Sequence, residues 1–480
     1  MEEFQNKNPE SAVFYERDSD KAITSLFICP AIMNNKLRFV RPVISLDAAH
    51  LSSENKGTLY LATIKSGNDE ILPIAIGMTI ENENYKGWKY FLNHLKTSCG
   101  VLTINHRFAR CHPFKLFTFI SDRDKGLLPA IQELFPENHQ TNCQFHIRAN
   151  AIQTFGLKVG NLVQKIGKTF SLRREQKLLH DLKVISPKAS EYIAKIPPET
   201  WRNTEWLKNN SLPPRYGIVT SNNSESANSM FKDARSFTWL YALDKMLHII
   251  MLKIANLRKI YKDKKGMIPS CERHYKKMFD TSANYRVTAI NEDLSTYKVY
   301  KGVGNDYNYH ESHEINMENK TCTCGYWQDT ELLCVHAMAY YRIIEEKNLK
   351  EIFDLPFCQY YSYQYLYKLY KENINPVIIE VLPNDNETKP PPINRKRQAG
   401  RPPTKRIRKR SKTGVTIKCS NCTKPGHNRK TCPEPIGLRN IPNEVPVNTI
   451  DTETQNVQSR EDTQLQSDVQ SNNRAENTFY

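Results

Sequence analysis

The chain has 480 residues, 39% of them hydrophobic, and a formal net charge of +17 at pH 7. That length is enough for two or three domains with buried cores. The sequence contains no run of about 18 apolar residues, so it predicts no membrane span and no membrane partner. The polar start "MEEFQNKNPE" also lacks the apolar segment of a signal peptide. The positive charge favours a polyanionic partner, with nucleic acid as the first candidate.

The pattern of the first part of the chain predicts an α/β fold. Residues 1–40 are expected to form a short lead-in to the core, with a strand or two in "SLFICPAIM". Three apolar, β-branched runs then follow at the short spacing of neighbouring strands: "PVISLDAAHL", "GTLYLATIKS" and "ILPIAIGMTI". An amphipathic helix is predicted in "NYKGWKYFLNHLKTS", a fourth strand in "FKLFTFISD" and another helix in "KGLLPAIQELF".

The later part of the chain is mainly helical in pattern until its composition changes. Residues 147–215 are charged and helical, and two more helices are predicted in "NNSESANSMFKDARS" and "WLYALDKMLHIIMLKIANLRKIYKDKK". A hairpin is expected in "STYKVYKGV" and "HESHEINMENKTCTC", followed by a helix in "CVHAMAYYRIIEEKN". After about residue 384 the chain is rich in Pro, Lys, Arg, Asn, Gln and Thr. This composition predicts a basic disordered linker at 385–412 and a disordered tail at 435–480.

Two aspartates that follow apolar runs are candidate catalytic metal ligands. Asp47 is expected to end the strand "VISLD", and Asp122 the strand "LFTFISD". Carboxylates at strand ends can converge on one edge of a sheet, where two or three of them can hold Mg²⁺ ions for phosphodiester cleavage. The alternative is that both begin ordinary turns. Asp124 is the rival to Asp122, and it is better explained as the N-cap of the following helix.

The twelve cysteines are predicted to be thiols or metal ligands, because a chain without a secretion signal meets a reducing compartment. "CTCGYWQDTELLCVH" offers Cys322, Cys324, Cys334 and His336, a ligand set that suits zinc. The alternative is a buried cysteine pair beside a core histidine. The strand pattern before this motif and the helix after it resemble the SWIM zinc finger, a ββα module, expected at 290–350.

A second Cys/His motif, "CSNCTKPGHNRKTC" at 417–434, lies in the polar tail. Its Cys419, Cys422, His427 and Cys432 have the spacing of a closed tetrahedral zinc knuckle. So short a segment has no apolar core, so zinc would supply the free energy of its folding. Knuckles of this CCHC kind bind single-stranded nucleic acid in some proteins and other proteins elsewhere, and both partners stay open here.

The basic segment "NRKRQAGRPPTKRIRKR" precedes the knuckle. Its two clusters, Arg395–Arg397 and Lys405–Arg410, are typical of a bipartite nuclear localisation signal, so a nuclear location is expected. "GRPPTKR" also resembles a degraded AT-hook, which would contact the DNA minor groove. The expected nucleic-acid contacts in this segment are Arg401, Lys405, Arg406 and Arg408. The alternative is a solvated basic linker with non-specific phosphate affinity.

Three blocks of the sequence resemble the transposases of Mutator-like elements (MULEs), in the order found in that family. The blocks are "RPVISLDAAHLSSENKGTLYLATIKSGNDEILPIAIGMTIENENYKGWKYFLNHL", "FTFISDRDKGLLPAIQELFPENHQTNCQFHIRANA" and "PPRYGIVTSNNSESANSMF". The resemblance runs from about Asn8 to Phe357, and a SWIM finger follows the catalytic core in this family as well. The basic segment and the knuckle match the tail of many members.

The resemblance implies a DDE transposase with an RNase H-like mixed sheet at 41–260 and an all-helical insertion at about 147–215. Asp47, Asp122 and Glu225 match the three catalytic acids, which would hold two Mg²⁺ ions, with Mn²⁺ as a substitute. The implied partners are transposon ends and target DNA, bound by a homo-oligomer when active. Cys143 and His146 match a C-x₂-H signature, for which contact of His146 with nucleic acid and a structural role are both open.

Two functions are therefore expected as alternatives. In the first, the chain is a transposase that cleaves DNA at element ends and transfers the strand. In the second, it is a domesticated, catalytically inactive DNA- or chromatin-binding transcriptional regulator. Family members commonly carry an N-terminal DNA-binding zinc domain, whereas the first block here starts about 40 residues from the beginning, which favours the second. The retained acids favour the first.

Overall fold

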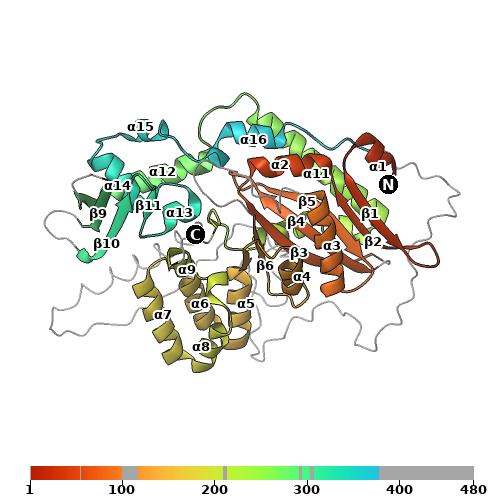
Figure 1. Ribbon diagram of the computed structural model, residues 1–480, viewed down its shortest axis with the longest axis horizontal. Coiled ribbons are helices and arrows are strands. Elements are labelled where there is room, and N and C mark those ends of the chain that lie inside the picture. Colours follow the sequence, from red (N-terminus) through yellow and green to blue (C-terminus); the bar gives the residue numbers. More distant parts are fainter. Residues whose placement is uncertain are drawn as a thin grey trace, which may run out of the picture. The chain divides into compact units, whose positions relative to one another are not determined.

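The computed structural model describes residues 2–53, 56–99, 117–208, 213–290, 295–302 and 308–377. The expected zinc knuckle and the basic segment with Arg401, Lys405, Arg406 and Arg408 lie outside these ranges. Within them, every helix is too short or too polar to cross a lipid bilayer. The fold is of the mixed α/β class that the sequence predicted, with one large mixed sheet and many helices (Figure 1).

A seven-stranded sheet forms the centre of the fold, in the order β1-β2-β5-β4-β3-β6-β7. The three predicted meander strands are present and pair antiparallel, whereas β6 and β7 run parallel to β3. The strand bounds are β1 Ala12–Arg17, β2 Ile23–Cys29, β3 Val43–Leu51, β4 Gly57–Lys65, β5 Ile71–Thr79, β6 Thr118–Ser121 and β7 Gln140–Asn142. The central strand β4 is buried along almost its whole length, as expected for a sheet covered on both faces.

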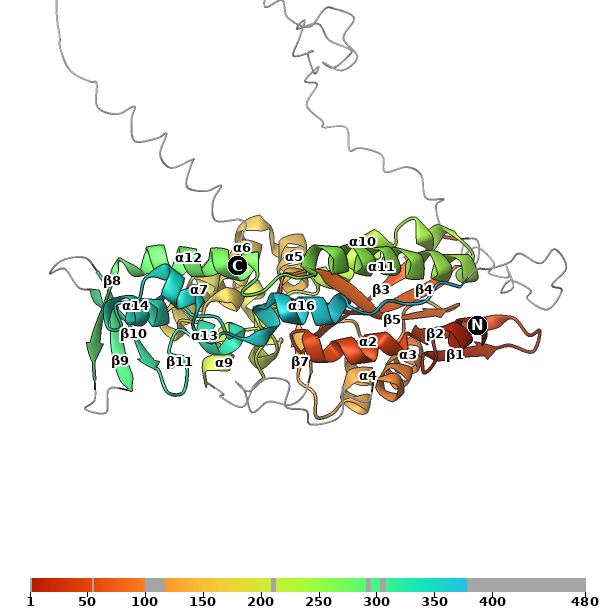
Figure 2. The same ribbon diagram turned by 90° about the horizontal axis from the view of Figure 1, so that it is seen from above.

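Helices cover both faces of this sheet (Figure 2). On one face lie α10 Asn222–Met230 and the 23-residue α11 Trp239–Tyr261. On the other lie α3 Tyr85–Ser98 and α4 Leu127–Leu134, with α3 burying its predicted apolar stripe of Trp88, Phe91, Leu92 and Leu95. Gly87 lets α3 come close to the sheet, because a Cβ there would lie 2.1 Å from the Tyr60 hydroxyl on β4.

The region that was predicted to be helical contains α5 Gln144–Phe155, α6 Leu157–Lys168, α7 Leu172–Ile185, α8 Pro187–Ala194 and α9 Asn203–Lys208. These helices have a hydrophobic core of their own, separate from that of the sheet, in which Trp201 is buried. The side-chain amide of Gln144, at the start of α5, connects α5 to the end of α6 and to the residues before α9. Its Nε2 donates to the carbonyls of Gly167 at 3.0 Å and Trp201 at 2.7 Å.

A second, four-stranded antiparallel sheet has the order β11-β10-β9-β8. The predicted hairpin is its centre, β9 Thr296–Lys301 and β10 Asn308–Asn316. The single strand expected in "HESHEINMENKTCTC" is divided into β10 and a separate β11 Thr321–Cys322, and the sequence did not predict the outer strand β8 Tyr285–Ala289. The helices of this part are α12 Pro269–Ser282, α13 Tyr326–Thr330, α14 Val335–Ile343 and α15 Leu349–Phe353.

The two ends of the described chain lie together. The first two helices are α1 Glu2–Lys7 and α2 Ala31–Lys36, and the last is α16 Tyr363–Tyr370. The buried ammonium of Lys36 donates to the carbonyls of Leu369 and Glu372 at the C-terminal end of α16. Asn8 and Asn375 exchange two hydrogen bonds, at 2.7 and 3.0 Å, across 367 positions of sequence. These two hydrogen bonds, called the asparagine clamp below, connect the first and last parts of the described chain.

Candidate active site and zinc centre

Asp47 and Asp122 come from adjacent parallel strands. The pairing of β3 with β6 sets Ser45 opposite Ile120, so the same register, continued for two residues, sets Asp47 level with Asp122. Asp122 directly follows β6, as predicted. The prediction that Asp47 ends its strand was wrong, because β3 continues to Leu51 and pairs with β4 throughout. Residues before and after Asp47 in the chain therefore pair with β4, and this pairing fixes the backbone of Asp47.

Helix α10 brings Glu225 and Asn228 to the same place. The helix packs across β3, β4 and β5, and Asn228 Nδ2 donates a 2.6 Å hydrogen bond to Asp47 Oδ2. Glu225 and Asn228 are three residues apart, so they lie on one face of the helix. Asn228 was not predicted from the sequence. The one usable indication was its spacing from Glu225.

The charges of these acids influence one another. Burial, followed by the negative charge of Asp122, raises the pKa of Asp47 to about 7, and Glu225 adds a smaller contribution in the same direction. The hydrogen bond from Asn228 opposes this rise, because it stabilises the carboxylate. Burial also raises the pKa of Asp122 above its usual value. The two half-buried aspartates therefore raise the cost of ionising one another, and a cation would reduce that cost.

His146, on α5, lies beside this group. Its Nε2 is 3.0 Å from Glu225 Oε1, and its Nδ1 is 3.4 Å from Ser221 Oγ. A hydrogen bond with Cys143, followed by the charges of Cys143, Glu225 and Asp122, raises the pKa of His146 to about 9. The raised pKa favours the protonated imidazole, which at this distance would form an ion pair with Glu225. The predicted contact of His146 with nucleic acid stays a prediction.

Cys143 is fully buried and forms part of the same network. Its Sγ accepts a 3.2 Å hydrogen bond from the backbone N–H of Ser221, one residue before α10. Burial alone would raise the pKa of this thiol, but hydrogen bonds from His146 and Ser221 lower it below its usual value. The C-x₂-H pair thus connects the start of α5 to the start of α10.

Asp124 lies just before α4, but the prediction that it is the N-cap of this helix was wrong by two residues. Its Oδ1 accepts hydrogen bonds from the backbone N–H groups of Gly126 at 2.7 Å and Leu127 at 3.1 Å, at the start of α4. The N-cap position itself is Gly126. Both aspartates line an open cavity of about 800 Å³ together with His146 and Glu83. Burial, followed by the charge of Asp124, raises the pKa of Glu83 to about 7.

The donor set of the three acids fits Mg²⁺. Carboxylate oxygens are the ligands that this ion prefers, and Mg²⁺ keeps several of its own water molecules. In the described part of the chain, the three acids do not form a group whose ligand atoms all lie within 4.8 Å of one another. Burial and the neighbouring carboxylates raise the pKa of Asp47, and a bound cation would act in the opposite direction.

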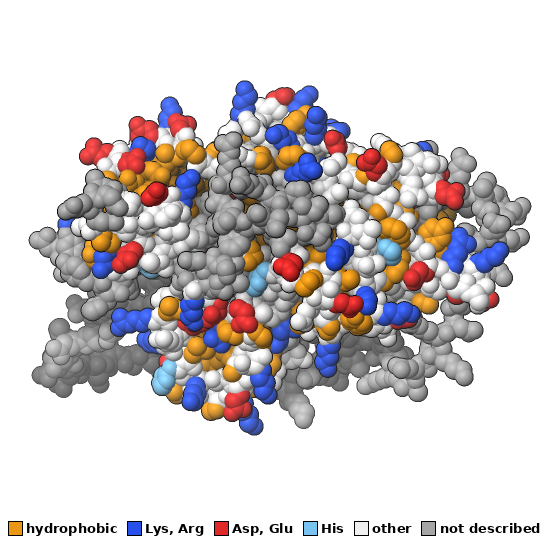
Figure 3. All heavy atoms as spheres, in the orientation of Figure 1, with side chains coloured by type: hydrophobic (Ala, Val, Ile, Leu, Met, Phe, Trp, Pro, Cys, Tyr) orange, Lys and Arg blue, Asp and Glu red, His pale blue; other side chains and the backbone are white. Residues whose placement is uncertain are grey.

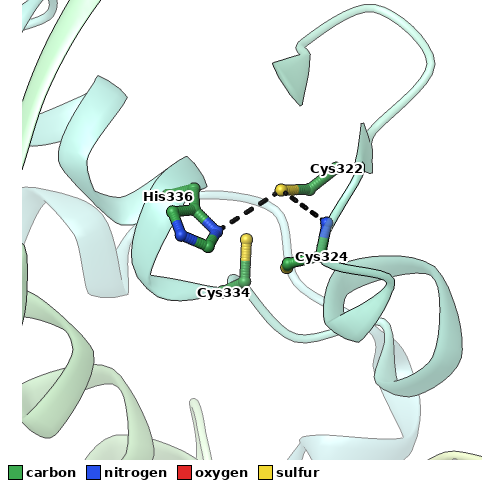
Figure 4. A group of neighbouring side chains, drawn as sticks. All are labelled: Cys322, Cys324, Cys334 and His336. Carbon is green, nitrogen blue, oxygen red and sulfur yellow. Dashed lines mark hydrogen bonds between the residues drawn. The ribbon is translucent and has the colours of Figure 1, made fainter. Parts of the chain in front are cut away.

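The four predicted zinc ligands converge closely (Figure 4). The ligand atoms of Cys322, Cys324, Cys334 and His336 all lie within 4.8 Å of one another. Cys322 is on β11 and Cys324 follows it, Cys334 is the N-cap of α14, and His336 lies in the first turn of that helix. Three sulfurs and one imidazole nitrogen are a ligand set for structural zinc. The alternative of a cysteine pair beside an unrelated histidine does not explain this convergence.

Comparison with protein families finds two matching domains. Residues 43–150 match the MULE transposase domain, and residues 297–339 match the SWIM zinc finger. The chain thus contains a MULE transposase domain followed by a SWIM zinc finger, a combination that is consistent with DNA binding. Asp47 and Asp122 lie inside the first match, and Glu225 lies beyond it. No curated protein matches the chain.

Proposed function

We propose that the chain is a Mutator-like DNA transposase that cleaves DNA at element ends and transfers the strand. Asp47, Asp122 and Glu225 would hold the metal ions of an RNase H-like core. The observation that carries this proposal is the register of β3 and β6, which brings Asp47 level with Asp122, under a helix that contributes Glu225 and Asn228.

The three acids would hold two Mg²⁺ ions, which would supply charge stabilisation to the oxygens of a displacement at phosphorus. Mn²⁺ would substitute for Mg²⁺. Asn228 orients the Asp47 carboxylate and favours its ionised form, so that it can act as a ligand at neutral pH. His146 positions Glu225 and provides a positive charge beside the cavity, where a DNA phosphate could approach.

Exposed basic side chains around the helical bundle support DNA as the substrate. Figure 3 shows Lys and Arg around α6 to α8, in the lower part of the view. The exposed members on or next to these helices are Lys158, Lys165, Arg173, Arg174, Lys177, Lys183, Lys188 and Lys195. They would neutralise phosphates without reading sequence. A nuclear location, additional contacts from the basic segment and the knuckle, and a homo-oligomer when active belong to the same proposal.

One observation favours the alternative of a domesticated, inactive regulator. Glu225 Oε1 already lies 3.0 Å from His146 Nε2, so a protonated His146 would offset its negative charge without a metal ion, although this oxygen accepts no hydrogen bond from the described residues. A protein that only binds DNA could keep such an ion pair for the stability of its fold.

Nicking of supercoiled plasmid DNA by the purified full-length chain tests the two functions. We expect Mg²⁺- or Mn²⁺-dependent nicking that is lost in Asp47→Ala, Asp122→Ala and Glu225→Ala. Asp20→Ala, at an exposed position between β1 and β2, is the matched control and should keep wild-type activity. Equal cleavage by the wild type and the three variants would refute the transposase. DNA binding without cleavage would support the regulator.

A further inference from the structure

A short connecting segment, residues 213–221, leads directly into α10. Its Arg215 is fully buried and contacts Asp329 of α13, in the zinc finger. Asp329 Oδ1 accepts from the Arg215 backbone N–H at 3.0 Å and lies 3.4 Å from Arg215 Nε. The next residue, Tyr216, donates its backbone N–H to the carbonyl of Asp329 at 2.7 Å. Two consecutive residues are thus bound to one residue of the finger.

The same connecting segment also contacts the part of the fold that carries the acids. Arg41, two residues before β3, donates from Nη1 to the Tyr216 carbonyl at 3.4 Å. Further along the segment, the Val219 carbonyl accepts a 3.0 Å hydrogen bond from the backbone N–H of Gln144. The segment is therefore held between the finger on one side and β3 and α5 on the other. Its last residue, Ser221, immediately precedes the helix of Glu225 and Asn228.

The backbone of this segment has an uncommon conformation where it meets the finger. Tyr216 has a φ of 54° and Gly217 a φ of 71°. A positive φ is rare for a bulky residue, and such a conformation persists where surrounding contacts hold it in place. The contacts here include a 3.2 Å hydrogen bond from the Tyr216 hydroxyl to Glu331 Oε1, which also comes from the finger.

Asp329 lies between two of the zinc ligands in sequence. Its helix, α13, is part of the segment from Cys324 to Cys334, and zinc bound to both cysteines would join the ends of that segment. Its neighbour Gln328 exchanges two hydrogen bonds with the backbone of Cys322, at 2.8 and 3.1 Å. A chain of direct contacts thus runs from the zinc ligands through α13 to the connecting segment and then to α10.

We propose that the zinc finger is a positioning element for the proposed active site, and that Asp329 is the residue through which it acts. By holding Arg215 and Tyr216, Asp329 sets the start of α10 and so the place of Glu225 and Asn228. This inference rests on the proposed function only for the role of α10. The side chains of Arg215 and Asp329 are 0% and 3% exposed, so this ion pair is closed to DNA.

The substitution Asp329→Asn in the full-length chain tests the proposal, because it removes the charge and keeps the shape. We expect hydrogen exchange in residues 213–230 to rise about tenfold, while β4 and β5 keep their protection. Mn²⁺ binding, measured by the EPR signal of the free ion, should weaken about tenfold, as for other residues that orient metal ligands. Zinc content should stay unchanged. Asp354→Asn, an exposed position after α15, is the matched control and should change none of these values.

A milder variant covers the case in which Asp329→Asn does not fold. Tyr216→Phe removes only the hydroxyl that donates to Glu331, and it should increase exchange in residues 213–230 in the same direction by a smaller factor. Unchanged exchange of α10 in a folded Asp329→Asn protein would overturn the proposal, as would an equal rise in exchange over the whole unit.

The two arms of the experiment separate this inference from the proposed function. A wild-type chain that neither binds Mn²⁺ nor cleaves DNA would refute the transposase, and the exchange measurement would still decide whether the finger positions α10. A wild-type chain that cleaves DNA, with wild-type Mn²⁺ affinity and exchange in Asp329→Asn, would refute the positioning role alone.

Discussion

Asn228 on α10 donates a 2.6 Å hydrogen bond to Asp47 on β3, across 181 positions of sequence. This contact joins the helix of the third acid to the strand of the first. It is also the hydrogen bond that keeps the pKa of Asp47 from rising further. The hydrogen bond from Asn228 therefore orients the Asp47 carboxylate, a proposed metal ligand, and favours its ionised form.

Asn228→Ala should raise the Mg²⁺ concentration that the proposed nicking activity needs. Without the hydrogen bond the pKa of Asp47 rises above about 7, so at neutral pH more of this carboxyl is protonated and unable to bind a cation. Hydrogen bonds to charged groups contribute about 1.5–3 kcal/mol, so we expect at least about a tenfold higher Mg²⁺ concentration for half-maximal nicking. Asn93→Ala, at an exposed position of α3, is the control. An unchanged Mg²⁺ requirement would show that the hydrogen bond has no part in metal binding.

Asp47→Asn should stabilise the fold at alkaline pH. The folded pKa of Asp47, about 7, is higher than that of an unfolded aspartate, so its contribution to stability is present at low pH and is lost as the pH rises through 7. At about pH 8 without divalent ions, the variant should melt several degrees above the wild type, and at about pH 4 the difference should vanish. Added Mg²⁺ should raise the melting temperature of the wild type and leave that of Asp47→Asn unchanged. A variant that is less stable than the wild type at both pH values would contradict this reasoning.

Asp122→Ala and Asp124→Ala should have opposite effects. We expect Asp122→Ala to abolish nicking at little cost in melting temperature, because removal of a half-buried carboxyl of raised pKa offsets the loss of the 3.2 Å hydrogen bond that its Oδ1 accepts from the Asp124 backbone N–H. Asp124→Ala loses the acceptor for two backbone N–H groups at the start of α4, which should cost about 1 kcal/mol of stability and leave nicking in place. Plasmid nicking and thermal melting of both variants, side by side, are the measurements. Loss of nicking in Asp124→Ala with an unchanged melting temperature would reverse the assignment.

Cys334→Ser should remove one zinc ion per chain. Cys334 is both a ligand and the N-cap of α14, so the variant should also melt at a lower temperature. Cys271→Ser is the matched control, since Cys271 is equally buried and lies outside the ligand group. Metal analysis of the purified proteins should show the loss in the first variant and wild-type zinc in the second. The same zinc content in both would remove Cys334 from the ligand set.

The sequence predicted best those features that depend on neighbouring residues. The meander strands were recognisable from their short apolar runs, and the zinc ligands from a spacing confined to 322–336. Asp122 could be separated from Asp124 because a strand ends before one and a helix begins after the other. β7 was missed because its three residues, "QTN", are polar and its pairing with β6 is not encoded locally.

Long-range partners could not be predicted in the same way. Glu225 lies in a polar helix with no distinguishing pattern of its own, so only the family resemblance pointed to it. Arg215 and Asp329 are 114 positions apart, and neither charge is unusual for its local sequence. The two residues pair because both are buried, and a buried charge needs a partner. Which charged residues are buried depends on the packing of the whole fold, so the local sequence does not predict it.

The clamp between Asn8 and Asn375 has a practical consequence for handling the protein. Because the two ends of the described chain meet, they can be joined by a short linker and the chain reopened at an exposed loop elsewhere, as circular permutation requires. A permutant opened between β1 and β2 would keep the strands of both aspartates, the connecting segment and the finger in one continuous stretch. Reporter groups placed next to Asn8 and Asn375 would lie close together in the folded unit and separate when it unfolds, so energy transfer between them would report its unfolding directly.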